Sequence, residues 1–227
     1  MTDQHIILLG GLWLGPSAWD GVVAEIQKRD RRAVAVTLPG QGDGNTAATL
    51  DDQVNAVLAA VDAAPAGSVV VGHSAACTLA WLIADARPAQ VGKVVMIGGF
   101  PQADGELYAN FFPIENGVMP FPGWEPFEGA DAADLDEQRR RTFSDAAIPV
   151  PEGVAKGTVR LSDERRYQVP VVMVCPEYTP AQAREWLDTG ELPELAKAKH
   201  IDLVDIDSGH WPMLTRPAEL ARILTDA

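Results

Sequence analysis

The sequence predicts an α/β protein whose mostly parallel, doubly wound sheet is flanked by helices. Six short apolar runs have the length and composition of buried strands, and they cover residues 6–9, 33–38, 69–71, 94–97, 171–175 and 201–206. Amphipathic helical patterns lie between most of these runs, as the crossovers of a parallel sheet require. With 227 residues the chain can bury one sizeable core, so we expect a single domain over residues 1–227.

The predicted helices follow the strands in order, and three of them begin after a serine or threonine that can cap the first turn. They cover residues 18–29 after Ser17, 50–63 after Thr49, 75–86, 181–187 after Thr179 and Pro180, and 217–225. In such an alternation the carboxyl ends of the strands share one edge of the sheet. We expect the functional groups to gather at that edge.

The alternation stops over residues 101–166, where prolines, glycines and aromatic residues crowd together. A loop of that length without a role is uncommon in a compact domain. We interpret the segment as a small irregular lid inserted after the fourth strand, with one helix around residues 132–144. Its aromatic side chains, including Phe111 and Phe112, either line an apolar pocket or pack within the lid.

Ser74 lies on a predicted strand-to-helix turn. Residues 68–76 read Ser-Val-Val-Val-Gly-His-Ser-Ala-Ala, a strand-like run that leads at once into a helical pattern. A serine on so sharp a turn takes a strained, positive-φ conformation, which requires very small residues two positions before and after it. Gly72 and Ala76 meet that requirement. The pattern predicts that the Ser74 hydroxyl stands out at the carboxyl edge of the sheet and acts as a nucleophile.

A serine hydroxyl needs a general base, and histidine has a suitable pKa near neutral pH. The sequence has four histidines. His5 begins the first strand and His200 lies in a helical stretch, so we interpret both as surface residues. The side chain of His73 is expected to point away from the neighbouring hydroxyl. His210 follows the last predicted strand in a loop at the same edge as Ser74, and it is the predicted base.

A carboxylate must orient the imidazole of His210 and stabilise its positive charge. Glu177 is the acidic residue just past the fifth predicted strand, where such a group is well placed. Asp104, after the fourth strand, is the rival candidate, and Asp207 is too close in sequence to bend back onto His210. The sequence favours Glu177 and leaves Asp104 open.

The oxyanion formed by attack on a carbonyl group needs preorganised N–H donors, each worth roughly 3–4 kcal/mol. One predicted donor is the amide of Ala75, at the amino terminus of the helix after Ser74. The second is expected from the loop after the first strand, where Gly10 and Gly11 allow close approach of the backbone. We assign it to the amide of Leu12, with Trp13 as the next choice.

Charge and composition exclude several classes of partner. Eighteen basic and thirty-two acidic residues give a net charge of −14, which repels nucleic-acid backbones and anionic membrane surfaces. The apolar run over residues 6–14 is too short to span a membrane and lacks the features of a signal peptide, so a cytoplasmic location is expected. Cys77 and Cys175 form neither a zinc motif nor a disulfide framework, so we expect packing roles and no metal site.

Together these motifs resemble the α/β-hydrolase family over nearly the whole chain. Gly72-His73-Ser74-Ala75-Ala76 is similar to its nucleophile elbow, residues 38–42 to its Pro-Gly-x-Gly loop and residues 209–212 to its histidine loop, and the order serine, acid, histidine agrees. The resemblance implies a catalytic triad, an oxyanion hole and no cofactor, in the short-lid branch that includes plant esterases and hydroxynitrile lyases.

Three positions depart from the family pattern. Gly10-Gly11 replaces the usual His-Gly pair, so a side chain that steadies the oxyanion loop is missing. Ala76 replaces the last glycine of the elbow. The position of the usual aspartate falls near Thr179, so Glu177 is a displaced substitute.

The sequence therefore predicts a carboxylic-ester hydrolase that forms an acyl-enzyme on Ser74. Apolar residues near the expected pocket, Trp13, Trp211, Phe111 and Phe112, favour a small, uncharged and moderately hydrophobic ester. A hydroxynitrile-type lyase is an alternative, although such lyases have a lysine directly after the catalytic histidine, where this chain has Trp211. A small-molecule receptor or signalling partner is a second alternative on the same scaffold. The sequence names no protein partner.

Overall fold

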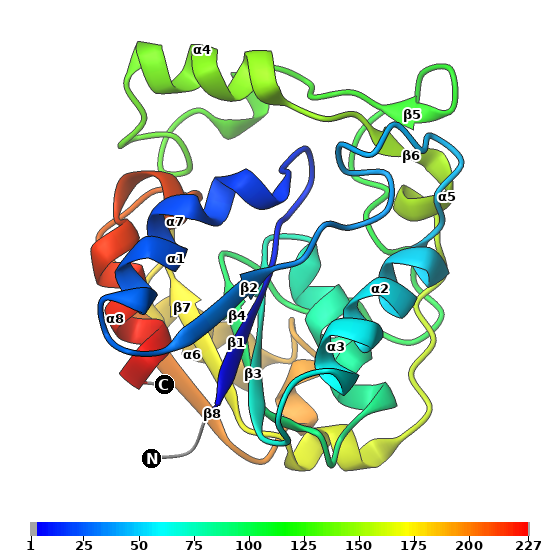
Figure 1. The fold of residues 1–227 in the computed structure, drawn as a ribbon, viewed down its shortest axis with the longest axis vertical. Helices are drawn as coiled ribbons and strands as arrows, with labels where there is room; N and C mark the ends of the chain where they lie inside the picture. The colour runs from blue at the N-terminus through cyan, green and yellow to red at the C-terminus, as the bar shows by residue number, and fades with distance from the viewer. Residues whose placement is uncertain (1–3, 227) are drawn as a thin grey trace.

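The computed structural model describes residues 4–226 and has the predicted architecture, a six-stranded parallel sheet between two layers of helices (Figure 1). The strands of the sheet are β1 (His5–Leu9), β2 (Arg32–Ala35), β3 (Ser68–His73), β4 (Val91–Ile97), β7 (Val171–Cys175) and β8 (Ile201–Asp205). Their spatial order is β2-β1-β3-β4-β7-β8, and every neighbouring pair is parallel. The loops that follow β1, β3, β7 and β8 therefore open at one edge of the sheet.

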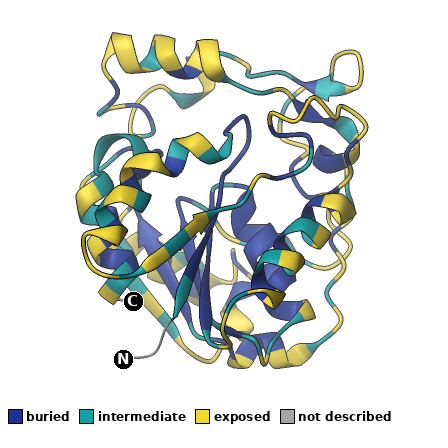
Figure 2. Ribbon diagram, in the orientation of Figure 1, coloured by how far each residue is buried: buried dark blue, intermediate teal, exposed yellow. Residues whose placement is uncertain are grey.

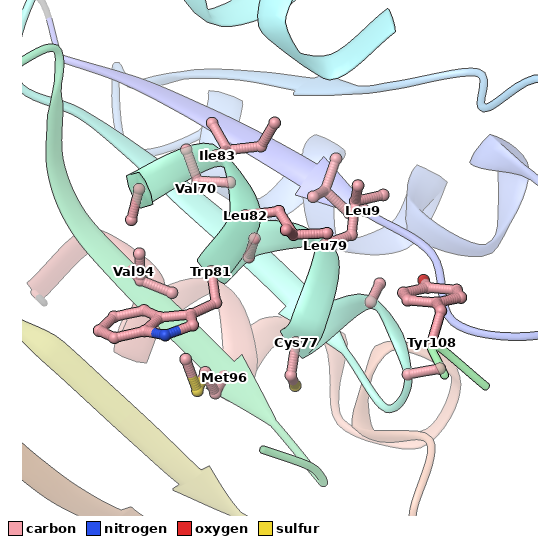
Figure 3. Close-up of a cluster of buried hydrophobic side chains, with 14 of the residues drawn as sticks. Leu9, Val70, Cys77, Leu79, Trp81, Leu82, Ile83, Val94, Met96 and Tyr108 are labelled. Carbon is pink, nitrogen blue, oxygen red and sulfur yellow. The ribbon is translucent and has the colours of Figure 1, made fainter. Parts of the chain in front are cut away.

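Alternate strand residues pack into two cores, one on each face of the sheet. Leu9 and Val70 belong to the core under α2 and α3, which Figure 3 shows in close-up. Leu8 and Val71 belong to the opposite core, together with residues of α1 and α8. Fully burying one such side chain stabilises the fold by about 1.5–3 kcal/mol. The two cores therefore keep the sheet rigid and fix the positions of the loops at its edge.

The layers contain α1 (Asp20–Gln27), α2 (Leu50–Asp62), α3 (Ala76–Ala86), α6 (Pro180–Thr189), α7 (Pro212–Thr215) and α8 (Pro217–Asp226). Thr49 and Thr179 begin α2 and α6 with capping boxes, in which the threonine hydroxyl accepts an N–H three residues later and that residue's side chain accepts the threonine N–H. Both predicted caps are confirmed.

Two predicted boundaries near the start of the chain are wrong. Ser17 does not cap the first helix, because Pro16 already begins a 3-10 turn over Pro16–Trp19, and α1 starts at Asp20 without a side-chain cap. The second strand ends at Ala35 and does not continue to residue 38. β2 lies at the edge of the sheet and pairs with β1, whose own last residue is Leu9, so the chain beyond residue 36 has no strand to pair with there.

The predicted lid, residues 101–166, lies between β4 and β7 and has its own small elements. These are an antiparallel pair, β5 (Val118–Met119) with β6 (Val150–Pro151), and the helices α4 (Glu137–Ala146) and α5 (Glu152–Ala155). Figure 1 shows α4 and the β5–β6 pair beyond the carboxyl ends of the strands, and Figure 2 shows that much of α4 is exposed. Its role as a lid stays a prediction.

The helix expected around residues 132–144 begins later, at Glu137, where the Asp136 side chain accepts the N–H of Arg139. Asp131, just before the predicted start, contacts another loop instead, since its carbonyl accepts the N–H of His210 over 2.7 Å. No helix within residues 4–226 has both the length and the apolar character needed to cross a membrane.

A buried ion network fastens the end of the predicted lid to the rest of the fold. The guanidinium of Arg166 lies 3.1 Å from a carboxylate oxygen of Asp85 on α3 and 2.9 Å from one of Glu194, and all three side chains are less than a tenth exposed. Arg166 also donates to the Tyr167 hydroxyl, and Trp81 Nε1 donates to Glu194 over 3.0 Å.

We expect Arg166→Met to destabilise the protein by about 3–5 kcal/mol, because buried Asp85 loses the Arg166 cation and buried Glu194 keeps, of its ion pairs, the one with Lys197 at 3.3 Å. The matched control is Arg165→Met. Arg165 pairs with Asp163 at the surface with its side chain 74% exposed, so its loss should cost about 1 kcal/mol or less. Urea unfolding of both variants measures the difference. Equal, small losses would show that the buried network contributes little.

Candidate active site

Ser74 lies between β3 and α3 in the strained turn that the sequence predicts. Its φ is +54°, a left-handed conformation that few residues other than glycine adopt. A Cβ atom on Gly72 would lie 2.2 Å from the carbonyl oxygen of Ala76, so only glycine fits two residues before the serine. The N–H of Ser74 donates to the Ile97 carbonyl at the end of β4 over 2.8 Å. The predicted positive-φ turn is confirmed.

Ser74 and His210 line one cavity at the carboxyl edge of the sheet, with a volume of about 200 Å³. The four aromatic residues predicted for the pocket, Trp13, Phe111, Phe112 and Trp211, line the same cavity. Leu12, His73 and Phe127 complete the wall. Apart from Ser74 and the two imidazoles, the lining side chains are aromatic or aliphatic.

A larger cavity of about 350 Å³ lies on the other side of Trp13, between α4 and the segment around Gly15. Neither Ser74 nor His210 lines it. We therefore place the candidate active site in the smaller cavity, which the predicted nucleophile Ser74 and the predicted base His210 both line.

The structure brings Glu177 and His210 together. The Nδ1 atom of His210 lies 2.8 Å from Oε1 of Glu177, and the two side chains are 13% and 14% exposed. With an ionised carboxylate as acceptor, Nδ1 carries the proton and Nε2 keeps the lone pair that a general base needs. Gly98 makes room for this pair, since a Cβ atom there would lie 3.1 Å from Nδ1 of His210 and 3.2 Å from Oε2 of Glu177.

The rival carboxylates lie elsewhere. Asp104 is exposed, and its Oδ1 accepts the N–H of Leu161 over 2.8 Å, within the predicted lid. Asp207 is also exposed and stands in the loop before His210. The geometry thus favours Glu177 over the alternative that the sequence left open.

The two residues predicted to supply oxyanion amides both lie near Ser74, one directly after it in the chain and one in the wall of the same cavity. Ala75 caps the amino terminus of α3, where the first N–H groups have no carbonyl partner within the helix. Leu12 lines the cavity from the loop after β1. That loop comes very close to the serine, because a Cβ atom on Gly11 would lie 3.0 Å from the Cβ of Ser74. Trp13, the next residue along, has a positive φ of 64°.

His73 is the site residue whose position the sequence did not reveal. It is 1% exposed, and its Nε2 lies 2.7 Å from the backbone carbonyl of His210. This contact requires the proton on Nε2, so Nδ1 is unprotonated, and Nδ1 has no hydrogen-bond partner among residues 4–226. Burial lowers the pKa of His73 well below its usual value, and the neighbouring His210 lowers it further.

A neutral buried histidine makes stability depend on pH in a defined direction. In the unfolded chain His73 binds a proton near pH 6.5, whereas in the folded chain it stays neutral at that pH. The contribution of His73 to the free energy of unfolding is therefore complete above pH 6.5 and decreases as the solution becomes more acidic. Between pH 7 and pH 5.5 the free energy of unfolding of the wild type should fall by about 1 kcal/mol because of His73. A His73→Gln variant, whose side chain can still donate to the His210 carbonyl, should not show this loss. Urea unfolding at both pH values measures this, and parallel losses would contradict it.

The loop that carries His210 makes one more hydrogen bond to the predicted lid and packs closely against it at Gly209. The hydroxyl of Ser208 donates to Oδ2 of Asp134 over 3.1 Å, and a Cβ atom on Gly209 would lie 2.2 Å from the carbonyl oxygen of Asp131. Partial burial raises the pKa of Asp131. The sequence gave no sign of these contacts, because they join segments more than seventy residues apart.

Both cysteines are buried, as predicted. The Sγ of Cys77 donates to the Gly72 carbonyl over 3.3 Å, and burial raises its pKa far above the usual range. Burial also raises the pKa of Cys175 to about 12. Neither thiol is therefore a nucleophile near neutral pH. Within residues 4–226, His, Cys, Asp and Glu side chains form no group of three or more that could hold a metal ion.

The sequence matches the model of the alpha/beta hydrolase family over residues 6–223. No curated protein matches it. Solved structures with a similar fold include an extracellular alpha/beta-hydrolase from a Paenibacillus species, which shares structural and functional homology with tobacco salicylic acid binding protein 2 (TM-score 0.80, 18% identity, 99% of this chain and 98% of that chain).

Two other solved structures have a similar fold. One is a methylesterase from Arabidopsis (TM-score 0.76, 14% identity, 98% of both chains), and the other is a pyrethroid hydrolase from Sphingobium faniae (TM-score 0.73, 20% identity, 98% of this chain and 96% of that chain). At these identities the likeness concerns the fold.

Proposed function

The chain belongs to the alpha/beta hydrolase family, and we propose that it is a serine hydrolase that cleaves small, moderately hydrophobic carboxylic esters. The observation that carries the proposal is that Ser74, on its strained turn, lines the same cavity as His210, which is hydrogen-bonded to Glu177. A nucleophile, a base and an orienting acid are the three groups that acyl transfer through a serine needs.

In the proposed reaction the Oγ of Ser74 attacks the ester carbonyl carbon while Nε2 of His210 takes the hydroxyl proton. Glu177 accepts the hydrogen bond from Nδ1 and stabilises the resulting imidazolium. The carbonyl oxygen becomes an oxyanion between the amides of Leu12 and Ala75. His210 then gives the proton to the departing alcohol oxygen, which leaves an acyl group on Ser74. A water molecule, deprotonated by His210, attacks that acyl group and releases the acid.

The size and lining of the cavity support a small, uncharged substrate. Its volume of about 200 Å³ lies below the roughly 300–1,000 Å³ of typical drug-sized sites. Its walls offer aromatic surface, and the chain's net charge of −14 disfavours an anionic ligand. The names of two proteins of similar fold also agree with a hydrolase, since one is a methylesterase and the other a pyrethroid hydrolase.

A lyase of the hydroxynitrile type has less support. Lyases of this type, which the chain resembles in fold, have a lysine directly after the catalytic histidine. In this chain the corresponding residue is Trp211. Trp211 is 2% exposed and packs edge-on against His210, with ring centroids 4.9 Å apart, so the position offers no cation to stabilise cyanide.

The test is turnover of nitrophenyl esters together with labelling by a fluorophosphonate. We expect an initial burst of nitrophenol, mapping of the label to Ser74, and faster turnover of acetyl and butyryl esters than of long-chain esters. A folded protein that neither takes the label nor turns over any ester would remove the hydrolase proposal. Ligand binding without turnover would favour a receptor instead.

A further inference from the structure

Gln41 makes a buried contact that the reaction as described does not use. Its side chain is in the turn after β2, the residue is 4% exposed, and its Nε2 donates to the Gly11 carbonyl over 3.3 Å. Gly11 and Leu12 share one peptide unit, and the Leu12 amide of that unit is the proposed oxyanion donor. The Gln41 amide thus holds the opposite end of the same peptide plane.

Because the peptide bond is planar, a contact to the Gly11 carbonyl also affects the Leu12 N–H. In a trans peptide the C=O and the following N–H point in opposite directions, and rotation about the bond between them is blocked. Anchoring the Gly11 oxygen therefore also fixes the direction of the Leu12 N–H. The plane lies against the nucleophile, since a Cβ atom on Gly11 would be 3.0 Å from the Cβ of Ser74 and 2.8 Å from Nδ1 of His73.

Gln41 is itself held firmly enough to act as an anchor. It stands between Gly40 and Gly42, both with positive φ, and its own N–H donates to the Leu38 carbonyl over 2.9 Å. From α2, the buried Gln53 side chain donates to the Pro39 carbonyl over 2.9 Å and fixes the start of the same turn. The loop after β1 has glycine at both Gly10 and Gly11, so no side chain there holds that peptide. Within the loop, the Leu14 N–H reaches the Gly11 oxygen over a longer distance of 3.4 Å.

We propose that Gln41 is a positioning residue that aims the Leu12 N–H at the oxyanion by holding the Gly11 carbonyl. This inference rests on the proposed serine-hydrolase function. An oxyanion donor acts on the tetrahedral species, in which the oxygen carries charge, and far less on the neutral ester. Loss of the anchor should therefore lower kcat and leave KM nearly unchanged.

The test is Gln41→Met, which keeps an unbranched chain of similar length but has no N–H donor, with Gln41→Leu as a second apolar variant. Removing an oxyanion donor outright lowers kcat by about 100- to 1,000-fold, so a misaimed donor should cost about 10- to 100-fold. The affinity of an alkyl boronic acid, which forms a tetrahedral adduct with Ser74, should fall by the same factor. KM should stay close to that of the wild type.

The matched control is Gln90→Met, which removes a glutamine contact to the Ala64 carbonyl (3.1 Å) at the amino end of β4, on the opposite edge of the sheet from the cavity. It should keep wild-type kcat and boronic acid affinity. Equal losses of kcat in both variants would overturn the role of Gln41, as would wild-type kcat in Gln41→Met. A wild-type protein with no ester turnover would overturn the hydrolase proposal as well, so the two failures are distinguishable.

Discussion

Replacing Ser74 with alanine is expected to lower ester turnover by about a millionfold and to abolish fluorophosphonate labelling. The Ser74 oxygen forms the bond to the acyl group in the proposed reaction, and without it His210 has no hydroxyl to deprotonate, so the triad fails as a unit. What activity remains would come from cavity binding and the oxyanion amides acting on water. Steady-state turnover and mass spectrometry of the labelled protein measure both effects.

The fold should survive this change, because alanine has the same backbone restrictions as serine at the φ of +54°. Ser68, on the strand that leads to Ser74, offers a matched control. It is fully buried at the start of β3, where its hydroxyl donates to the Pro65 carbonyl over 2.6 Å, far from the carboxyl edge. Ser68→Ala should keep turnover and labelling. Label that remains bound to the Ser74→Ala variant would show that another residue is the nucleophile.

Glu177→Gln is expected to lower kcat by about ten-thousandfold with little change in KM. The substituted amide can donate a hydrogen bond to Nδ1 of His210, which places the imidazole proton on Nε2 and removes the lone pair that accepts the serine proton. It also removes the negative charge that stabilises the imidazolium. The contact that would change is the 2.8 Å pair between His210 and Glu177.

The control for this prediction is Asp104→Asn, the carboxylate that the sequence left as a rival. Asp104 is exposed and accepts a backbone N–H from Leu161, so its loss should leave kcat near the wild-type value. A large loss in Asp104→Asn with normal turnover in Glu177→Gln would move the acid to Asp104. Circular dichroism of both variants would show that the comparison concerns folded protein.

The turn at Ser74 and the helix caps could be predicted because each depends on residues that are close together in the sequence. The turn at Ser74 follows from Gly72, His73 and Ala76, since a Cβ atom at position 72 would clash with backbone four residues later. The capping boxes at Thr49 and Thr179 likewise need only the residues of one helical turn. Where local rules competed, as at Pro16 and Ser17, the prediction chose the wrong one.

The edge strand shows the limit of local reasoning. Residues 33–38 have the apolar composition of a strand, but the length of β2 is set by its neighbour β1, which turns away after Leu9. The helix of the predicted lid also begins later than its sequence pattern suggests, at Glu137, and Asp131, just before the predicted start, instead accepts the N–H of His210 through its carbonyl. In both segments the observed contacts involve partners far along the chain.

The sequence alone determined the alternation of strands and helices, the strained turn at Ser74 and the edge of the sheet where His210 would lie. Steric limits and hydrophobic periodicity act over a few residues, so they can be read directly from the chain. Only the tertiary structure decided that Glu177 and not Asp104 contacts His210, that His73 binds the His210 carbonyl, and that Gln41 holds Gly11. These contacts join residues 30 or more positions apart, and the crossing of packed strands and loops sets their geometry.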